Sequence, residues 1–272
     1  MTDTSPTNDD RPPESVAAAA PERPVAETDR RPRGADPVRA VGIGPGTPEY
    51  LTPRGERAIR EADAVVGFET VVDYVRERID GEPLACGYDD QGETLAAFAE
   101  RVADGAAGTA VLMGDPNFSG YQFLGRVERA VDRPVEVVPG ISAVQVAASR
   151  ARTPIEDATF VTLHRRGDLT ADRERLRAAV GDRHLLVLPR PYDLMPGDIA
   201  ADLLDAGADP ALTALVYERL THDDEAVTRA ALGELAAHAG GGGPDDTPFS
   251  DLSVLVVRAD SSDPERVGGS DE

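Results

Sequence analysis

Three glycine-containing segments each come directly after a short apolar run that predicts a strand. They read Val41-Gly-Ile-Gly-Pro-Gly-Thr47, Met113-Gly-Asp-Pro-Asn-Phe-Ser-Gly120 and Val138-Pro-Gly-Ile-Ser-Ala143. Glycine lets backbone amides approach a ligand closely, and open α/β sheets bind ligands at the carboxyl ends of their strands. Each segment alone is equally typical of a plain turn or a helix cap. Three of them at strand ends in one domain predict a shared ligand site.

The first of these segments differs from the glycine loop of NAD-binding domains. In that fingerprint a helix begins inside the glycine pattern. Here Pro45 and Pro48 delay the next helix to about Thr52. The spacing therefore disfavours an NAD site.

An alternation of strands and helices must position the three segments. Apolar runs predict strands at 38–43, 64–66, 109–113 and 135–138, and helical periodicity predicts helices at 52–61, 94–103, 121–131 and 142–151. Beyond a boundary marked by Thr153 and Pro154, strands are expected at 159–163, 184–188, 214–218 and 252–257, with helices at 199–206 and 227–237. This succession predicts an α/β fold.

We expect two domains, at 38–151 and 154–259, with a tail on each side. Residues 1–37 are crowded with Pro, Asp, Glu, Thr and Arg and contain almost no large apolar side chain. Such a segment cannot bury enough surface to offset its chain entropy, so a disordered tail is predicted. Residues 260–272 are polar and predict a frayed end.

The composition excludes several classes of protein. The chain has 50 acidic residues against 28 basic ones, all of them arginine, and a formal charge of -22. A negative net charge is the wrong sign for binding the phosphates of nucleic acid. The excess of acidic residues indicates a salt-tolerant protein of a halophilic cytoplasm. The single cysteine, Cys86, cannot form an intramolecular disulfide or a cysteine-based zinc site. No apolar run approaches the roughly 18 residues that cross a bilayer, so neither a membrane partner nor a location outside the cytoplasm is expected.

Taken together, the three segments resemble the loops of the tetrapyrrole methylase family. Its first loop, its Gly-Asp-Pro loop and its Pro-Gly-Ile-Ser segment correspond, in order, to 41–47, 114–116 and 139–142. Gly-Phe-Glu at 67–69, the run at 157–166 and Tyr217-Glu218 look most like the cobalt-precorrin-7 C5-methyltransferase branch of cobalamin synthesis. The resemblance covers about 38–257. It departs at Thr47, where the family usually has Asp, and at Asn117, where a hydrophobic residue is common.

The resemblance implies two α/β domains of the tetrapyrrole methylase type, with S-adenosylmethionine held in the cleft between them. The residues that it assigns to this donor are Pro45, Asp115, Phe118, Ser142, Ala143, Leu188 and Pro189. It further implies methylation of cobalt-precorrin-6B at C5 to give cobalt-precorrin-7, chiefly by alignment of donor and carbon. A homodimer without a protein-bound metal is the corresponding expectation.

The carboxylates of a corrin precursor would need positive partners in this acidic protein. Arg165, Arg166 and Arg190 are therefore candidates for substrate binding. His164, at a predicted strand end beside two of them, either bonds or deprotonates the substrate or is a structural histidine.

Two further residues have alternative interpretations. Glu218 follows a buried strand and is either a substrate contact or a solvated loop acid. Tyr121, like Phe118, either packs on a flat ring or joins the core.

Two other functions remain open from the sequence. One is a sibling methylase, which acts on another tetrapyrrole position or on the elongation-factor residue of the diphthamide branch. The other is a non-catalytic nucleotide-binding α/β module, which would bind the donor without turnover.

Overall fold

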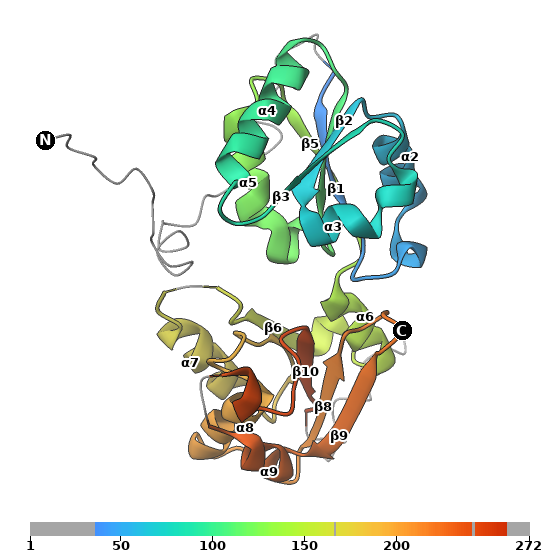
Figure 1. Cartoon of the computed structure of the whole chain (residues 1–272). Coiled ribbons are helices and arrows are strands. Elements are labelled where there is room, and N and C mark those ends of the chain that lie inside the picture. Colours follow the sequence, from blue (N-terminus) through green and yellow to red (C-terminus); the bar gives the residue numbers. More distant parts are fainter. Residues whose placement is uncertain (1–35, 166, 241–242, 260–272) are drawn as a thin grey trace, which may run out of the picture.

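Two α/β units make up the part of the chain that the computed structural model describes, which is residues 36–165, 167–240 and 243–259 (Figure 1). Residues 1–35 of the expected first tail, all of the expected tail at 260–272, and the candidate Arg166 lie outside the described residues. The prediction of two α/β domains is confirmed. The domain limits expected from the sequence stay predictions.

The first unit is built on a parallel sheet with the strand order β3-β2-β4-β1-β5. Its strands are β1 (Val38–Gly42), β2 (Ala64–Phe68), β3 (Glu82–Cys86), β4 (Gly108–Leu112) and β5 (Val135–Val138). All residues of the central strand β4 are buried, because a parallel sheet is covered on both faces. Since the strands run the same way, β4, β1 and β5 end side by side.

Helices cover both faces of this sheet (Figure 1). They are α2 (Pro53–Arg60), α3 (Glu69–Tyr74), α4 (Gln91–Ala103) and α5 (Tyr121–Ala130), with the short turns η2 (Pro48–Tyr50), η3 (Arg76–Arg78) and η4 (Pro116–Gly120). Phe98 of α4 and Leu124 of α5 are buried in one core cluster. Ile59 of α2 and Val72 of α3 are buried in another, so each pair of helices closes one face.

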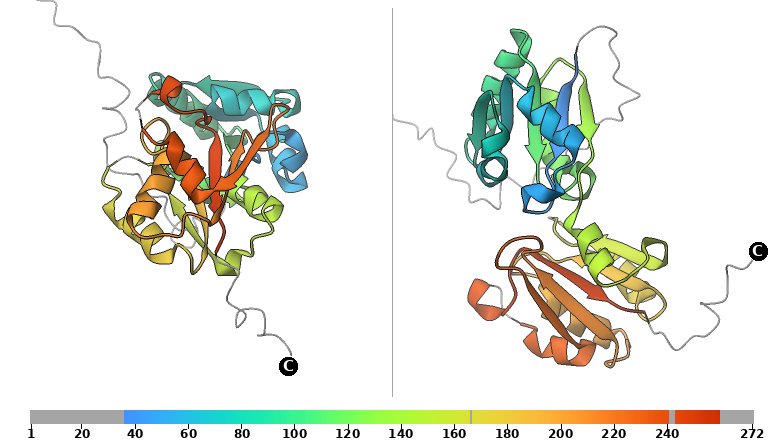
Figure 2. Two further views of the ribbon diagram at one scale, coloured as in Figure 1. Left: turned by 90° about the horizontal axis from the view of Figure 1, so that it is seen from below. Right: turned by 90° about the vertical axis from the view of Figure 1, so that its right-hand side faces the viewer.

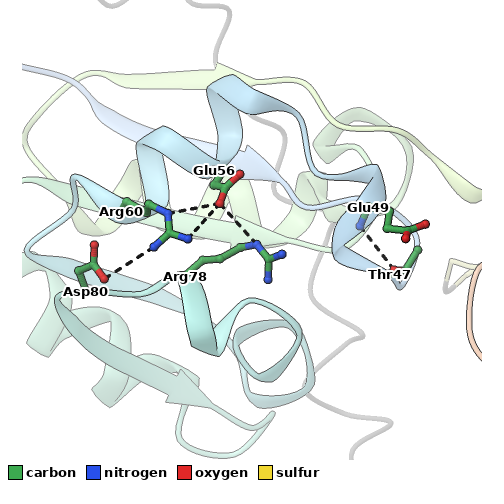
Figure 3. A network of polar contacts seen from close by, with 6 residues as sticks. All are labelled: Thr47, Glu49, Glu56, Arg60, Arg78 and Asp80. Atoms are coloured by element: carbon green, nitrogen blue, oxygen red, sulfur yellow. Dashed lines mark hydrogen bonds and ion pairs between the residues drawn. The ribbon is translucent and has the colours of Figure 1, made fainter.

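Ion pairs connect the outer side of α2 to the turn η3 (Figure 3). Glu56 lies 3.1 Å from Nη2 of Arg60 and 3.8 Å from Nε of Arg78. Arg60 also lies 3.9 Å from Asp80. These side chains are partly exposed, so each pair contributes little to stability.

The second unit contains a mixed sheet with the strand order β6-β7-β10-β8-β9. Its strands are β6 (Ala158–Thr162), β7 (His184–Leu188), β8 (Thr213–Glu218), β9 (Ala226–Ala231) and β10 (Ser253–Val257). β6 and β7 are parallel, β10 runs antiparallel to both β7 and β8, and β8 pairs antiparallel with β9. The carboxyl ends of β6, β7 and β8 therefore lie at the same edge of the sheet.

Helices also lie on both faces of the second sheet (Figures 1 and 2). They are α6 (Ala143–Arg150), α7 (Thr170–Ala179), α8 (Pro196–Asp205) and α9 (Leu232–Leu235), with the turns η5 (Ile155–Asp157), η6 (Ala236–His238) and η7 (Pro244–Asp246). Leu176, Leu203 and Leu235 place α7, α8 and α9 in one core. Val144 of α6 shares the opposite core with Val256. The domain limits expected from the sequence include α6 in the first domain, but the apolar residues of α6 pack on the second sheet.

The helix predicted at 227–237 is wrong in its first half. Residues 226–231 form the edge strand β9, in which Val227 and Thr228 pair with Tyr217 and Val216 of β8. A helix begins only at Leu232. The alanine-rich sequence favours a helix locally, but pairing with β8 decides the structure, and β-branched residues suit a strand. Because β9 is mostly exposed, its sequence lacks the alternation of apolar and polar residues that indicates a half-buried strand.

Besides β9, two helices and one strand were not expected from the sequence. Helix α7 is strongly charged, helix α3 has only six residues, and β3 is a partly exposed edge strand that contains Pro83. Cys86, at the end of β3, is a buried free thiol whose pKa is raised to about 11, first by burial and then by Asp90. A thiol with such a pKa is a poor nucleophile at neutral pH. Across the described ranges, no helix has the length and apolar character to cross a membrane.

Candidate functional site

The three glycine-containing loops meet at the carboxyl edge of the first sheet. They follow β1, β4 and β5, which are neighbours in the strand order. The N–H of Gly114 donates to the carbonyl of Gly44 over 2.8 Å, and the N–H of Gly44 donates to the carbonyl of Gly114 over 3.3 Å. The structure thus brings the three segments together.

Close packing of the loops explains most of their glycines. A Cβ on Gly42 would lie 2.5 Å from the carbonyl oxygen of Gly114 and 2.7 Å from the nitrogen of Gly140. A Cβ on Gly140 would lie 2.6 Å from the carbonyl oxygen of Gly42. Gly44 and Gly114 have φ values of +91° and +64°, which favour glycine. These residues therefore build a compact backbone platform, and their identity alone is not evidence for a ligand.

Asp115 connects the second loop to the third. Its Oδ1 accepts hydrogen bonds from the N–H of Asn117 over 2.8 Å and from the side-chain amide of Asn117 over 3.0 Å. Its Oδ2 accepts from the N–H of Gly140 over 3.0 Å, and the residue is 5% exposed. The departure from the family pattern at Asn117 therefore adds a bond to this carboxylate. Direct contact between Asp115 and a donor stays a prediction.

Ser142 begins helix α6 as its N-cap. Its hydroxyl accepts from the N–H of Val144 over 3.3 Å, and the side chain of Gln145 accepts from the N–H of Ser142 over 2.7 Å. This capping box satisfies backbone groups that a helix start leaves free. Ser142 is buried and Ala143 is half-buried. Donor binding by either residue stays a prediction.

An aromatic contact joins the second loop to the second unit. Phe118 lies in the π-helical turn η4, and its ring centroid is 5.3 Å from that of Phe160 on β6. Phe118 and Leu188, the last residue of β7, both pack against the same apolar cluster of the second unit. Two residues predicted to bind the donor therefore contact one shared cluster. Pro45 and Pro189 are buried at the ends of β1 and β7.

The described candidate arginines follow β6 and β7, and each is paired within the second unit. Arg165 forms an ion pair with Asp172 at the start of α7. Arg190 pairs with Asp193, and its Nη1 donates to the carbonyl of Gly167 over 3.4 Å. Both arginines lie at the edge formed by the carboxyl ends of β6, β7 and β8, and both keep part of their surface exposed.

His164 directly precedes Arg165, after the end of β6. His164 is exposed to solvent, but the protein on one side of the ring lowers the pKa of the imidazole because partial burial disfavours the charged form. The carboxylate of Asp251 acts in the opposite direction. His164 is therefore uncharged at neutral pH and can accept a proton or a hydrogen bond.

The two other substrate candidates are placed differently. Glu218 ends β8, is 8% exposed, and accepts a hydrogen bond from the N–H of Ser250 over 2.7 Å. It is a buried link to the chain before β10, so the alternative of a solvated loop acid is wrong. Tyr121 is the first residue of α5, and its side chain lies outside what the structure describes.

The structure adds contacts that the sequence did not indicate. The turn between β8 and β9, residues 219–225, contacts the first loop through Thr221 and His222. Tyr74, at the end of α3, contacts the same histidine. The pairs lie about 150 residues or more apart in the chain, so no local pattern could have found them. Among the described residues, no group of three or more His, Cys, Asp or Glu side chains could hold a metal ion.

Comparison with known proteins assigns the fold and the family. The sequence model of a family described as "Tetrapyrrole (Corrin/Porphyrin) Methylases" matches residues 37–236. A "Probable cobalt-precorrin-7 C(5)-methyltransferase" from Methanocaldococcus jannaschii is 26% identical over 226 residues, covering 82% of this chain and 98% of the relative. A "Uroporphyrinogen-III C-methyltransferase" from Paracoccus denitrificans is 30% identical over 217 residues, covering 74% of each chain.

The fold is also found among solved structures. The X-ray structure of "a cobalamin biosynthetic enzyme, cobalt precorrin-4 methyltransferase, CbiF" superposes with a TM-score of 0.63 and 18% sequence identity. The match covers 81% of this chain and 94% of the other. At this identity the likeness concerns the fold alone.

Proposed function

The chain belongs to the tetrapyrrole methylase family of S-adenosylmethionine-dependent methyltransferases, and from this premise we propose that it methylates C5 of a cobalt-containing corrin precursor. The reaction would convert cobalt-precorrin-6B into cobalt-precorrin-7. The observation that carries the proposal is the similarity to the Methanocaldococcus jannaschii protein, which extends over 98% of that relative. The motifs at 67–69 and at Tyr217-Glu218 support the same branch.

The donor is proposed to lie against the platform formed by the three glycine loops. Pro45, Phe118 and Leu188 would supply apolar surface to the donor, and the backbone of the loops would supply polar groups. The sulfonium of the donor provides an activated methyl group and its leaving group. The protein's task is then to hold donor and acceptor carbon in line, which by itself removes several kcal/mol of a barrier, about 7–11 in favourable cases.

The substrate is proposed to lie against the arginine loops of the second unit. Arg165 and Arg190 offer guanidinium groups suited to carboxylates, and Arg166 lies between them in sequence. Asp172 and Asp193 neutralise the cations of Arg165 and Arg190. Substrate carboxylates would compete with these aspartates, so binding exchanges one ion pair for another and avoids burying a bare charge.

A sibling reaction on uroporphyrinogen is the second candidate. It is favoured by the Paracoccus denitrificans relative, whose 30% identity exceeds the 26% of the cobalt-precorrin relative. We prefer the cobalt-precorrin reaction because the match covers 98% of the Methanocaldococcus jannaschii relative but only 74% of the Paracoccus denitrificans relative. The two candidates share the donor half of the site and differ in the substrate half.

A direct assay separates the candidates. The purified full chain is incubated in high salt with methyl-labelled S-adenosylmethionine and either cobalt-precorrin-6B or uroporphyrinogen III. We expect one methyl group on the cobalt-precorrin, located at C5 by NMR, and none on uroporphyrinogen. Transfer to uroporphyrinogen alone would replace the proposal with the sibling reaction. Donor binding without transfer to either compound would favour a non-catalytic module.

Removal of the Asp115 carboxylate tests the donor half. Asp115→Ala deletes the link between the second and third loops, so we expect S-adenosylmethionine to bind about tenfold more weakly, a change of about 1.4 kcal/mol. Asp132→Ala, an exposed aspartate at the opposite edge of the same sheet, is the matched control. Equal affinities of the two variants in calorimetry would contradict the donor-site assignment.

A further inference from the structure

The turn at residues 219–225 belongs to the second unit but touches the first glycine loop. The N–H of Thr47 donates a hydrogen bond to Oγ1 of Thr221 over 3.2 Å. The side chain of Thr47 accepts a second bond, from the N–H of Glu49 over 3.4 Å (Figure 3). The end of the loop is therefore held from two sides, once by its own unit and once by the turn.

His222 fills a space that Gly46 leaves open. A Cβ on Gly46 would lie 2.6 Å from Cδ2 of the imidazole, closer than real Cβ atoms come to other atoms. The backbone of Gly46 does not have a positive φ, unlike that of Gly44, so no turn geometry requires glycine there. A side chain at residue 46 would therefore have to displace the imidazole of His222.

Tyr74 fixes the orientation of the same ring. Its hydroxyl lies 3.4 Å from Nδ1 of His222, and the two rings meet edge to face with centroids 5.4 Å apart at 72°. His222 is thus enclosed by α3 through Tyr74 and by the first loop through Gly46. Both contacts come from the first unit, although the histidine belongs to the second.

The turn keeps a backbone conformation that most residues avoid. Arg219 and Thr221 have φ values of +44° and +73°, and such values are costly for a β-branched residue like threonine. The carboxylate of Glu225 accepts the N–H of Thr221 over 2.7 Å and forms an ion pair with Arg150 at the end of α6. These contacts hold the strained turn in place. Strain of this kind persists only where the surroundings enforce it, and it is concentrated at functional positions.

We infer that residues 219–225 form a positioning turn that holds the first glycine loop in its donor-binding conformation. Thr221 and His222 are its positioning residues, acting on Thr47 and Gly46. The inference rests on the proposed function, since it takes this loop as part of the donor site. The turn follows β8 at the same sheet edge as the arginine loops. It therefore connects the unit that would hold the substrate to the loop that would hold the donor.

A double-mutant cycle between Gly46 and His222 tests the inference. In Gly46→Ala the new methyl group collides with the imidazole, and we expect donor affinity to fall about tenfold or more. His222→Ala should weaken binding about threefold, because it loosens the loop without pushing it away. The double variant should return to the level of His222→Ala, since the space for the methyl group is then available.

The alternative explanation of Gly46 predicts a different cycle. If glycine is needed because the donor approaches its backbone, Gly46→Ala harms binding equally with and without His222. Additive losses in calorimetry with S-adenosylhomocysteine would therefore overturn the inference. Failure of the wild-type chain to bind the donor would overturn the proposed function itself, so the two failures are distinguishable.

A second pair of variants addresses Thr221. Thr221→Val keeps the shape and the backbone restriction but removes the oxygen that Thr47 contacts, whereas Thr221→Ser keeps the oxygen. We expect a raised KM for the donor with little change in kcat in the valine variant, and recovery in the serine variant. Equal KM values in both variants, with altered thermal stability alone, would assign Thr221 a purely structural role and overturn the inference.

Discussion

The loops of the two units are fixed by different forces. Those after β1, β4 and β5 are held mainly by backbone contacts, such as the exchange of hydrogen bonds between Gly44 and Gly114, together with the carboxylate of Asp115, which accepts from Gly140. Those after β6 and β7 are held by ion pairs, which join Arg165 to Asp172 and Arg190 to Asp193. The backbones of Gly42, Gly114 and Gly140 pack so closely that a Cβ on Gly42 or Gly140 would collide with them. Partly exposed ion pairs can exchange partners at little cost.

This difference separates two tasks. A platform of packed backbone suits a ligand that is the same in every turnover, because nothing has to move when it binds. Paired arginines suit a ligand with several carboxylates, because each incoming carboxylate can replace an aspartate. The first unit should therefore respond mainly to steric change, and the second to charge, pH and salt.

The largest expected effect comes from adding a methyl group to the platform. In Gly140→Ala the Cβ would meet backbone atoms of Gly42 and Gly114, which cannot rotate away as a side chain would. We expect the free energy of unfolding to fall by about 3 kcal/mol or more, with loss of donor binding. Gly92→Ala is the control, since a Cβ there would meet no atom within 4 Å apart from its chain neighbours and its own helix backbone, and it should be neutral or stabilising. Urea denaturation measures both, and equal stabilities would contradict the steric account.

The platform was largely predictable from the sequence, because its signals are local. Apolar runs indicated β1, β4 and β5, and a glycine segment followed each of them. A parallel α/β fold then places strand ends together. The sequence did not reveal that the carboxylate of Asp115 accepts hydrogen bonds from Asn117 and Gly140, since these bonds depend on how the loops pack.

The charged half was less predictable. The arginines were identified by type, but their pairing with Asp172 and Asp193 depends on how α7 and the β7–α8 loop fold back. The strand β9 was taken for a helix because its pairing with β8 leaves most of it exposed. His222 gave no local signal, because its partners Gly46 and Tyr74 lie in the other unit.

Arg190 tests whether the charged loops serve the substrate. Arg190→Ala removes a guanidinium but leaves the platform untouched, so we expect KM for the corrin substrate to rise about tenfold, or about 1.4 kcal/mol, with donor affinity unchanged. Steady-state kinetics and donor calorimetry measure the two quantities separately. Asp193→Asn, which frees Arg190 from its partner, should not raise KM. A loss of donor affinity in Arg190→Ala would contradict the division of tasks.

Asp202 tests the response of the second unit to pH. Burial tends to raise the pKa of this carboxyl, but hydrogen bonds from Arg173 and Arg177 outweigh it and lower the pKa. A lowered pKa contributes stability above the unfolded value of about 3.9, and this stability is lost as pH falls through the folded value. Asp202→Asn should therefore cost about 1 kcal/mol at pH 7, a modest figure because both arginines are about 40% exposed.

The difference between Asp202→Asn and the wild type should disappear in acid. Urea denaturation at pH 7 and at pH values well below the unfolded value of about 3.9 measures it, since the wild-type carboxyl is protonated only below its lowered folded pKa. Asp205→Asn, an exposed position on the same helix, is the control and should change stability by less than about 0.5 kcal/mol. A penalty that persists in acid would mean that packing, rather than charge, holds α7 to α8.

His164 gives the smallest expected effect and the finest test of the comparison. Its pKa is lowered by burial, so the folded chain binds fewer protons than the unfolded chain just below pH 6.5. Stability should therefore decrease as pH falls through that range, and His164→Gln, which carries no charge, should decrease less. If alignment alone accelerates the transfer, kcat of the glutamine variant stays within about twofold of wild type. A fall of about a hundredfold is typical of a lost general base, and it would place proton transfer, as well as carboxylate binding, in the charged half of the site.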